Sequence, residues 1–253
     1  MQKVYLMDIR PFIDSTYLKT ASQAALDEKQ NQVVVEHFIK EAVEERFKLI
    51  MIRPEMVALA KKIILEYKSN VQIGTVIDFP QGQSSLVQKL QEANQAIENG
   101  ADELDFVCNY EAFKKGEVEL VKQEILRGTQ LALAHNKIIK WIIEVAALTD
   151  KQIIQLSALI KNVVLAHFKE ADYASVFVKS STGFYKTENN EPNGATISTV
   201  IMMLENASPL SIKAAGGVRT YEDAVEMVRL GVKRIGTSSA RTIVNGEINQ
   251  DKY

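Results

Sequence analysis

Two lysines and one aspartate are the side chains of this sequence best suited to chemistry. Lys179 and Lys213 each end a short apolar run, and Asp105 lies inside a third one. A neutral lysine amine attacks carbonyl carbons to form a Schiff base, but free lysine has a pKa near 10.4 and is protonated at neutral pH. A catalytic lysine therefore needs burial or a nearby cation that lowers its pKa to roughly 7–8.

A second lysine can lower that pKa. At a separation of about 5 Å and an effective dielectric constant near 20, two like charges repel by roughly 3 kcal/mol, which is about two pKa units. Lys213 could act on Lys179 in this way. The spacing leaves an alternative open, in which one or both lysines simply pair with Asp105 or Glu144.

Two glycine-containing segments, residues 215–219 and 235–239, have the composition of phosphate-binding loops. Glycine lets backbone N–H groups approach phosphate oxygens, and Ser238 and Ser239 add hydroxyl donors. One Gly-Gly pair is common in turns, but two such loops after the last two predicted strands favour a phosphate site.

Other catalytic chemistries lack their residues. His37, His135 and His167 are far apart in predicted helices, and no His-Glu-x-x-His or cysteine pair is present, so we predict no metal. Cys108, the only cysteine, has no histidine at another strand end to activate it, so we predict a buried structural thiol. Trp141 is predicted to pack in the core.

Eight short apolar runs alternate with amphipathic stretches. The runs end near Asp14, Arg53, Asp78, Asn109, Glu144, Lys179, Lys213 and Gly236. Nearly continuous apolar strands are typical of a parallel sheet covered on both faces, either a closed barrel or an open doubly wound sheet. No Gly-x-Gly-x-x-Gly follows the early strands, so we predict the α/β class with a single TIM (β/α)8 barrel.

Three helix starts are readable. Ser84-Ser85 precedes a helix that Gly100 ends, while Thr149 and Thr220 begin segments with capping-box spacing, the second of which ends at Gly231. In a barrel, the carboxyl ends of the strands face the active site, so Asp14, Asp105, Glu144, Lys179 and Lys213 should converge there.

Length and composition set the remaining bounds. The 253 residues, 46% hydrophobic and 25% charged, fit one barrel domain over residues 1–253 with a short tail from about residue 246. A net charge of −2 without a basic stripe disfavours a nucleic-acid partner. No apolar run is long enough for a signal peptide or membrane span, so we expect a cytoplasmic protein without membrane contact. The chain length is compatible with a monomer or a homodimer.

The sequence resembles the deoxyribose-phosphate aldolases over nearly its whole length. The resemblance is carried, in order, by residues 13–16 (IDST), 76–82 (VIDFPQG), 98–105 (ENGADELD), 142–144 (IIE), 178–184 (VKSSTGF), 213–219 (KAAGGVR) and 236–239 (GTSS). The two lysine-containing segments are highly specific to that family.

The resemblance implies a metal-independent class I aldolase, a lyase without a cofactor. It would reversibly join acetaldehyde to D-glyceraldehyde 3-phosphate, giving 2-deoxy-D-ribose 5-phosphate, in deoxynucleoside breakdown. Lys179 would form the Schiff base, Lys213 would lower its pKa, and Asp105 would relay protons. The substrate and its phosphate would contact Asp14, Thr182, Gly183, Gly216, Gly217, Gly236, Ser238 and Ser239. Tyr253 would assist proton transfer as the last residue of a tail, unless that end is merely frayed.

Four residues depart from common members of the family. Ser15 stands where many members have histidine, and Gln81 stands where histidine or leucine is common. Met51 stands where some members have a cysteine. Phe184, as in many other members, stands where some have a lysine that contacts phosphate, and Lys186 could compensate. Ser15 and Gln81 could alter the rim of the pocket. Two other functions are weighed: a Schiff-base aldolase for another sugar or keto phosphate, and a non-catalytic barrel that binds phosphometabolites.

Overall fold

The computed structural model describes residues 7–188 and 191–246, and its strands form a closed ring. Eight parallel strands pair in chain order, and β1 pairs with β8. They are β1 (Ile13–Thr16), β2 (Leu49–Ile52), β3 (Gln72–Ile77), β4 (Glu103–Val107), β5 (Ile138–Ile142), β6 (Val176–Lys179), β7 (Ser211–Ala215) and β8 (Arg234–Thr237). The closed sheet confirms the predicted TIM barrel, and every strand ends within two residues of its predicted position.

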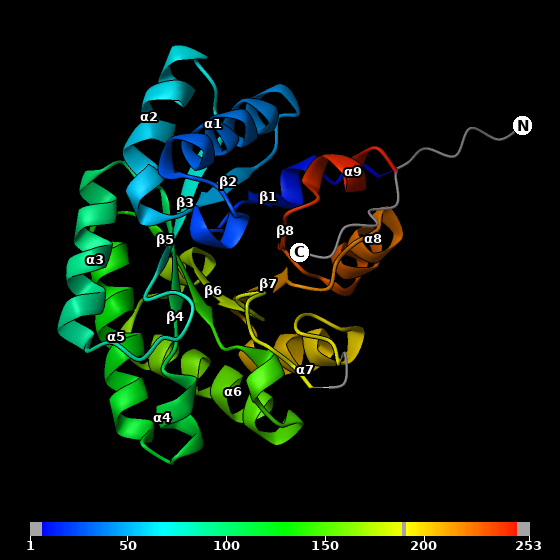
Figure 1. The fold of residues 1–253 in the computed structure, drawn as a ribbon. Coiled ribbons are helices and arrows are strands. Elements are labelled where there is room, and N and C mark those ends of the chain that lie inside the picture. The colour runs from blue at the N-terminus through cyan, green and yellow to red at the C-terminus, as the bar shows by residue number, and fades with distance from the viewer. Residues whose placement is uncertain (1–6, 189–190, 247–253) are drawn as a thin grey trace, which may run out of the picture.

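Helices surround this barrel (Figure 1). The α-helices are α1 (Glu28–Glu44), α2 (Val57–Glu66), α3 (Leu86–Glu98), α4 (Tyr110–Lys114), α5 (Val118–Ala134), α6 (Asp150–His167), α7 (Ile197–Ala207), α8 (Tyr221–Leu230) and α9 (Ala240–Val244). Short 3-10 turns are η1 (Arg10–Phe12), η2 (Ser22–Ala24), η3 (Pro54–Met56), η4 (Val145–Ala147) and η5 (Glu170–Ser175). None of the helices in the described ranges combines the length and apolar character that a bilayer crossing requires.

The three predicted helix starts are confirmed. Ser85, Thr149 and Thr220 are the N-caps of α3, α6 and α8, and each takes part in a capping box. At the other ends, Gly100 and Gly231 have φ angles of +106° and +113°, a backbone conformation that side chains with a Cβ rarely adopt. These local signals fix where the three helices begin and where α3 and α8 end.

The main apolar core lies between the strands and the helices. Phe106 and Trp141 pack with ring centroids 5.1 Å apart, and the Trp141 indole N–H donates to Thr129 of α5 at 3.1 Å. A methyl group on Gly128 would lie 2.7 Å from the Trp141 ring, so α5 needs glycine there to approach the sheet. Cys108 is buried in this core, and burial raises the pKa of its thiol. Both predictions of a packing role are confirmed.

The inside of the barrel is divided into an apolar and a charged part. Leu49, Met51 and Val76 form an apolar cluster with Leu18. Strands β4 to β8 and β1 instead turn charged side chains inward, because alternate residues of a strand face the same side. Burying charges costs free energy unless they are paired, so this charged part is where function is to be sought.

Candidate active site

Three of the predicted residues meet at one oxygen atom. Lys179 and Lys213 lie opposite each other in the register of β6 and β7. The Nζ atoms of both donate to Oδ2 of Asp105, each at 2.9 Å. All three residues are buried, with exposed fractions of 2% for Lys179 and 0% for the other two. The open alternative of an ordinary ion pair with Asp105 is therefore also realised, while no ion pair joins either lysine to Glu144 among the described residues.

Although Lys179 pairs with Asp105, the pKa of Lys179 is lower than that of an ordinary lysine. Burial is the main cause that lowers the pKa of Lys179 to about 8, and the ammonium groups of Lys213 and Lys140 lower it further. Asp105 opposes these effects. For Asp105 itself, burial raises the pKa, but the three lysines around it outweigh burial and hold its pKa well below the usual range. Asp105 is thus a fixed carboxylate beside an amine that can be neutral.

The motif reading missed three residues of this charged layer. Lys140 of β5 contacts Asp105 at 2.7 Å and Glu103 at 2.5 Å, and Glu103 also pairs with Arg234 at 2.8 Å. All are buried. Lys140 lies within an apolar run, and this isolated charge was the signal that could have found it. Glu103 and Arg234 begin their strands directly after a charged residue, so no such signal marks them.

Asp14 and Glu144 have partners other than substrate. Asp14 is fully buried and pairs with Lys213 at 2.6 Å and with Arg234 at 2.5 Å. It does not line the cavity described below, so the prediction of a substrate contact gains no support from its position. Glu144, just after β5, accepts hydrogen bonds from the backbone N–H and the hydroxyl of Thr182. It anchors the start of the loop between β6 and α7.

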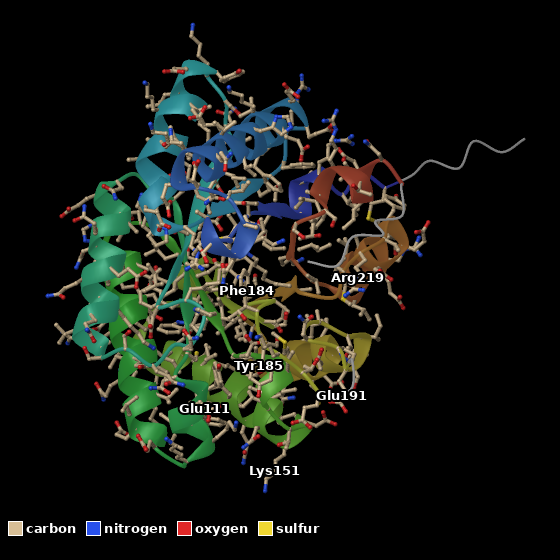
Figure 2. The ribbon with its side chains drawn as sticks, viewed as in Figure 1. Glu111, Lys151, Phe184, Tyr185, Glu191 and Arg219 are labelled. Carbon is tan, nitrogen blue, oxygen red and sulfur yellow. The ribbon has the colours of Figure 1, made fainter. Side chains whose placement is uncertain are left out.

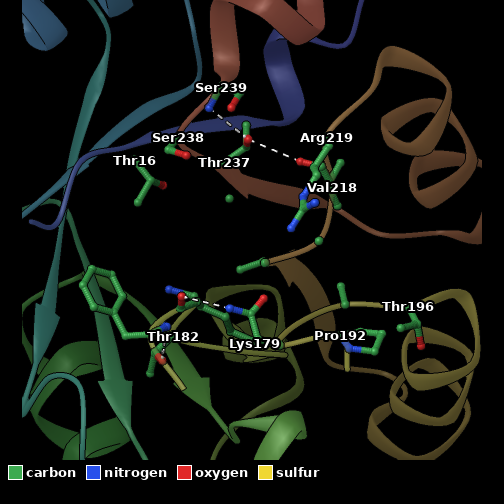
Figure 3. A pocket seen from close by; sticks show the side chains of 18 of the residues that line it. Thr16, Lys179, Thr182, Pro192, Thr196, Val218, Arg219, Thr237, Ser238 and Ser239 are labelled. Carbon is green, nitrogen blue, oxygen red and sulfur yellow. Dashed lines mark hydrogen bonds between the residues drawn. The ribbon is translucent and has the colours of Figure 1, made fainter. Parts of the chain in front are cut away.

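A cavity of about 630 Å³ opens above Lys179. Its lining includes all the predicted loop residues, namely Thr182, Gly183, Gly216, Gly217, Gly236, Ser238 and Ser239. Figure 3 shows Lys179 on one side and Ser238 on the other, with the Arg219 side chain reaching between them. Arg219, which the sequence places in one of the glycine-containing segments, adds a cation to the cavity wall.

The predicted phosphate-binding loop after β7 depends on glycine backbone conformations. Gly216 and Gly217 have φ angles of +71° and +85°. The loop after β6 packs directly on them, because the Ala195 N–H donates to the Gly216 carbonyl at 2.8 Å. A Cβ on Gly194 would overlap the Gly216 backbone. Gly194 thus lets the loop after β6 pack against Gly216, and no motif in the sequence singles it out.

The four departures lie in different environments. Ser15 is fully buried and alternates with Asp14 and Thr16, so it faces the helices and not the pocket rim, contrary to expectation. Gln81 is exposed and Met51 belongs to the apolar cluster inside the barrel. Phe184 lines the cavity and lies near the middle of the view in Figure 2. Its ring packs edge-on against the ring of Phe79, with the ring centroids 5.0 Å apart.

Other predicted features lie away from the cavity or beyond the described ranges. His37, His135 and His167 are exposed on helices or at their ends. Residues 7–188 and 191–246 contain no group of three or more His, Cys, Asp or Glu residues placed to hold a metal ion. Lys186 is exposed and does not line the cavity. Tyr253 and the tail from residue 247 lie outside the described residues.

Comparison with known proteins gives a consistent result. Residues 13–246 match the family model described as DeoC/LacD family aldolase. A deoxyribose-phosphate aldolase from Thermococcus gammatolerans is 36% identical over 249 residues, covering 97% of this chain and 99% of that protein. One from Streptococcus suis is 36% identical over 241 residues, covering 95% and 97%.

Solved structures agree. A putative deoxyribose-phosphate aldolase from Coccidioides immitis has a TM-score of 0.77 at 34% identity, covering 94% of this chain and 85% of that one. The deoxyribose phosphate aldolase from Aeropyrum pernix, described as having a unique tetrameric structure, has a TM-score of 0.74 at 28% identity, covering 94% and 89%.

Proposed function

The chain belongs to the DeoC/LacD family of aldolases, and on that premise we propose that it reversibly cleaves 2-deoxy-D-ribose 5-phosphate through a Schiff base on Lys179. The products are acetaldehyde and D-glyceraldehyde 3-phosphate. One observation carries the proposal. Among the described residues that line the cavity, Lys179 is the only lysine, and burial brings its pKa to about 8.

The reaction uses the iminium ion formed by the Lys179 amine as an electron sink. The neutral Nζ of Lys179 adds to the C1 aldehyde of the open-chain sugar, and loss of water from the carbinolamine gives an iminium ion. The C3 hydroxyl then loses its proton while the C2–C3 bond breaks, and the bonding electrons flow into the iminium to give an enamine. Glyceraldehyde 3-phosphate leaves. Protonation of the enamine at C2 and hydrolysis of the resulting iminium release acetaldehyde and free Lys179.

Asp105 and Lys213 handle protons in the first steps. Asp105 Oδ2 lies 2.9 Å from both amines, so a proton can pass between Lys179 and Lys213 through it. The departing water of the carbinolamine needs such a proton, and the second lysine can supply it. No step requires a metal, and we expect EDTA to leave the rate unchanged.

The far side of the cavity suits the phosphate group. Backbone N–H groups around Gly216, Gly217 and Gly236, together with the Ser238 and Ser239 hydroxyls, are donors for its oxygens. Arg219 adds a positive charge. This would hold the substrate with C1 toward Lys179. Asp14 would hold the Lys213 ammonium through its ion pair. For Tyr253 we keep the predicted role in proton transfer. We retain a monomer or homodimer as the expected assembly.

Borohydride trapping tests the Schiff base. Reduction in the presence of acetaldehyde should leave a two-carbon adduct on Lys179, located by peptide mass mapping, and Lys179→Ala should lose both the adduct and turnover. An adduct on another lysine would overturn the assignment. Cleavage rates with deoxyribose 5-phosphate and with other phosphorylated sugars then decide the substrate, because faster turnover of another sugar would favour a related aldolase. Binding of sugar phosphates without any adduct would favour a non-catalytic barrel.

A further inference from the structure

The buried charges below the cavity form a closed ring of ion pairs. Lys213 pairs with Asp14, which pairs with Arg234. Arg234 pairs with Glu103, which pairs with Lys140. Lys140 pairs with Asp105, and Asp105 returns to Lys213. Every distance in this ring lies between 2.5 and 2.9 Å, and the ring crosses five strands of the barrel.

The ring is electrically neutral without Lys179. Its cations are Lys140, Lys213 and Arg234, and its anions are Asp14, Glu103 and Asp105. Lys179 is attached to the ring only through Asp105, whose Oδ2 it shares with Lys213. A protonated Lys179 is therefore a surplus charge on a neutral, buried assembly, and such a charge is costly.

Glu103 and Arg234 belong to the part of the ring that touches neither Lys179 nor the cavity. We propose that these two are positioning residues. Through the charge of the ring, they set the fraction of molecules in which the Lys179 amine is deprotonated. This inference rests on the proposed function, since Lys179 must be the amine that reacts. The negative charge of Glu103 favours the ammonium form of Lys179, and the positive charge of Arg234 favours the free amine of Lys179.

The charged groups that act on Lys179 come from several strands, and Arg219 and Glu191 also line the cavity into which Lys179 opens. Asp105 of β4 contacts it, and Lys213 of β7 and Lys140 of β5 repel its charge. Glu144, beyond the end of β5, is a further carboxyl group near Lys179. Burial raises the pKa of Glu144, although its bonds from Thr182 and the charge of Lys179 act in the opposite direction. Glu144 lies outside the ring and is unchanged in the variants below.

The test compares two variants that remove charges of opposite sign from the ring. Glu103→Gln removes a negative charge and should move the acid limb of kcat/KM to lower pH, whereas Arg234→Met removes a positive charge and should move it to higher pH. A unit charge about 10 Å away at an effective dielectric constant near 20 corresponds to a shift of about one pH unit. At a pH well below the midpoint, the first variant should be about tenfold faster than wild type and the second about tenfold slower.

The double variant Glu103→Gln/Arg234→Met removes one charge of each sign from neighbouring positions. It should return the midpoint close to that of wild type, which a purely structural role would not do. Glu119→Gln and Lys62→Met are the controls, because they remove one negative and one positive charge from side chains that are 73% and 74% exposed. Solvent screens these charges, so the midpoint of the acid limb should not move. Circular dichroism checks that each variant is folded.

Each outcome decides the question. Shifts of the two single variants in the same direction, or no shift in folded protein, would overturn the proposal. If Arg234→Met does not fold, Glu103→Gln and the double variant still test the sign and the return. If Glu103→Gln does not fold, Asp14→Asn removes another ring anion and should give the same downward shift. Lack of the Lys179 adduct in wild type would instead overturn the proposed function itself.

Discussion

Lys179 and Lys213 face each other across neighbouring parallel strands and donate to the same oxygen of Asp105. The arrangement gives the two lysines different surroundings. Lys213 is also paired with Asp14 at 2.6 Å, whereas Asp105 is the only ion-pair partner of Lys179 in the described ranges. The amine with fewer anionic partners is the one that reaches the cavity. Four consequences of this arrangement and of the cavity can be measured.

The rate should depend on pH through Lys179. Its amine is free above a pKa of about 8 and protonated below it. We therefore expect kcat/KM to fall about tenfold per pH unit below pH 7.5 and to level off above pH 8.5, before other groups titrate. A plateau that extends down to pH 6 would contradict the assignment.

The stability of the protein should depend on pH through the same side chain. The pKa of Lys179 is about 8 in the fold against 10.5 for the unperturbed group, so between these values the unfolded chain binds more protons and wild-type stability rises with pH. Below pH 8 the full cost of the buried ammonium is present. Relative to Lys179→Met, wild type should gain about 2 kcal/mol in unfolding free energy between pH 7 and 9.5.

Urea unfolding at the two pH values measures this difference. Lys62→Met is the matched control, because Lys62 has a side chain 74% exposed and should give a difference that does not change with pH. A Lys179→Met difference that is equally independent of pH would mean that the pKa of Lys179 is not lowered in the fold.

A negative charge at Ser238 should weaken phosphorylated substrates. Ser238 lines the cavity beside Gly236, where the phosphate is expected. Ser238→Asp adds like charge at this position, so we expect at least a tenfold higher KM for deoxyribose 5-phosphate, equivalent to about 1.4 kcal/mol. Unphosphorylated deoxyribose serves as the control and should show little change. An unchanged KM for the phosphorylated sugar would move the phosphate site elsewhere.

A methyl group at Gly194 should disturb the same site by a different route. It would overlap the Gly216 backbone and push apart the loops after β6 and β7. We expect Gly194→Ala to cost about 1–3 kcal/mol of stability and to raise KM for the phosphorylated sugar. Gly116→Ala is the control for KM. Gly116 has a φ of +83°, so alanine there also costs stability, but its Cβ meets nothing within 4 Å and KM should not change. A KM unaffected by Gly194→Ala would show that this contact does not shape the site.

The sequence by itself determined the barrel, the helix starts and the residues at the mouth. A capping box at Thr149 depends only on residues three apart, and Gly231 ends α8 because of its own backbone freedom. Lys179 and Lys213 could be assigned to one site because the carboxyl ends of parallel strands meet at one face. Such signals are local, or follow from the topology alone.

Only the tertiary structure decided which charges pair. Asp105 meets Lys179 across 74 residues, and Arg234 meets Asp14 across 220. These contacts depend on the register in which the strands close, and no pattern along the chain specifies that register for a single charged residue. The same closure buries the ring and seats Gly194 on Gly216. A lysine in a sequence has an ordinary pKa; the buried, crowded interior of the barrel is what lowers the pKa of Lys179.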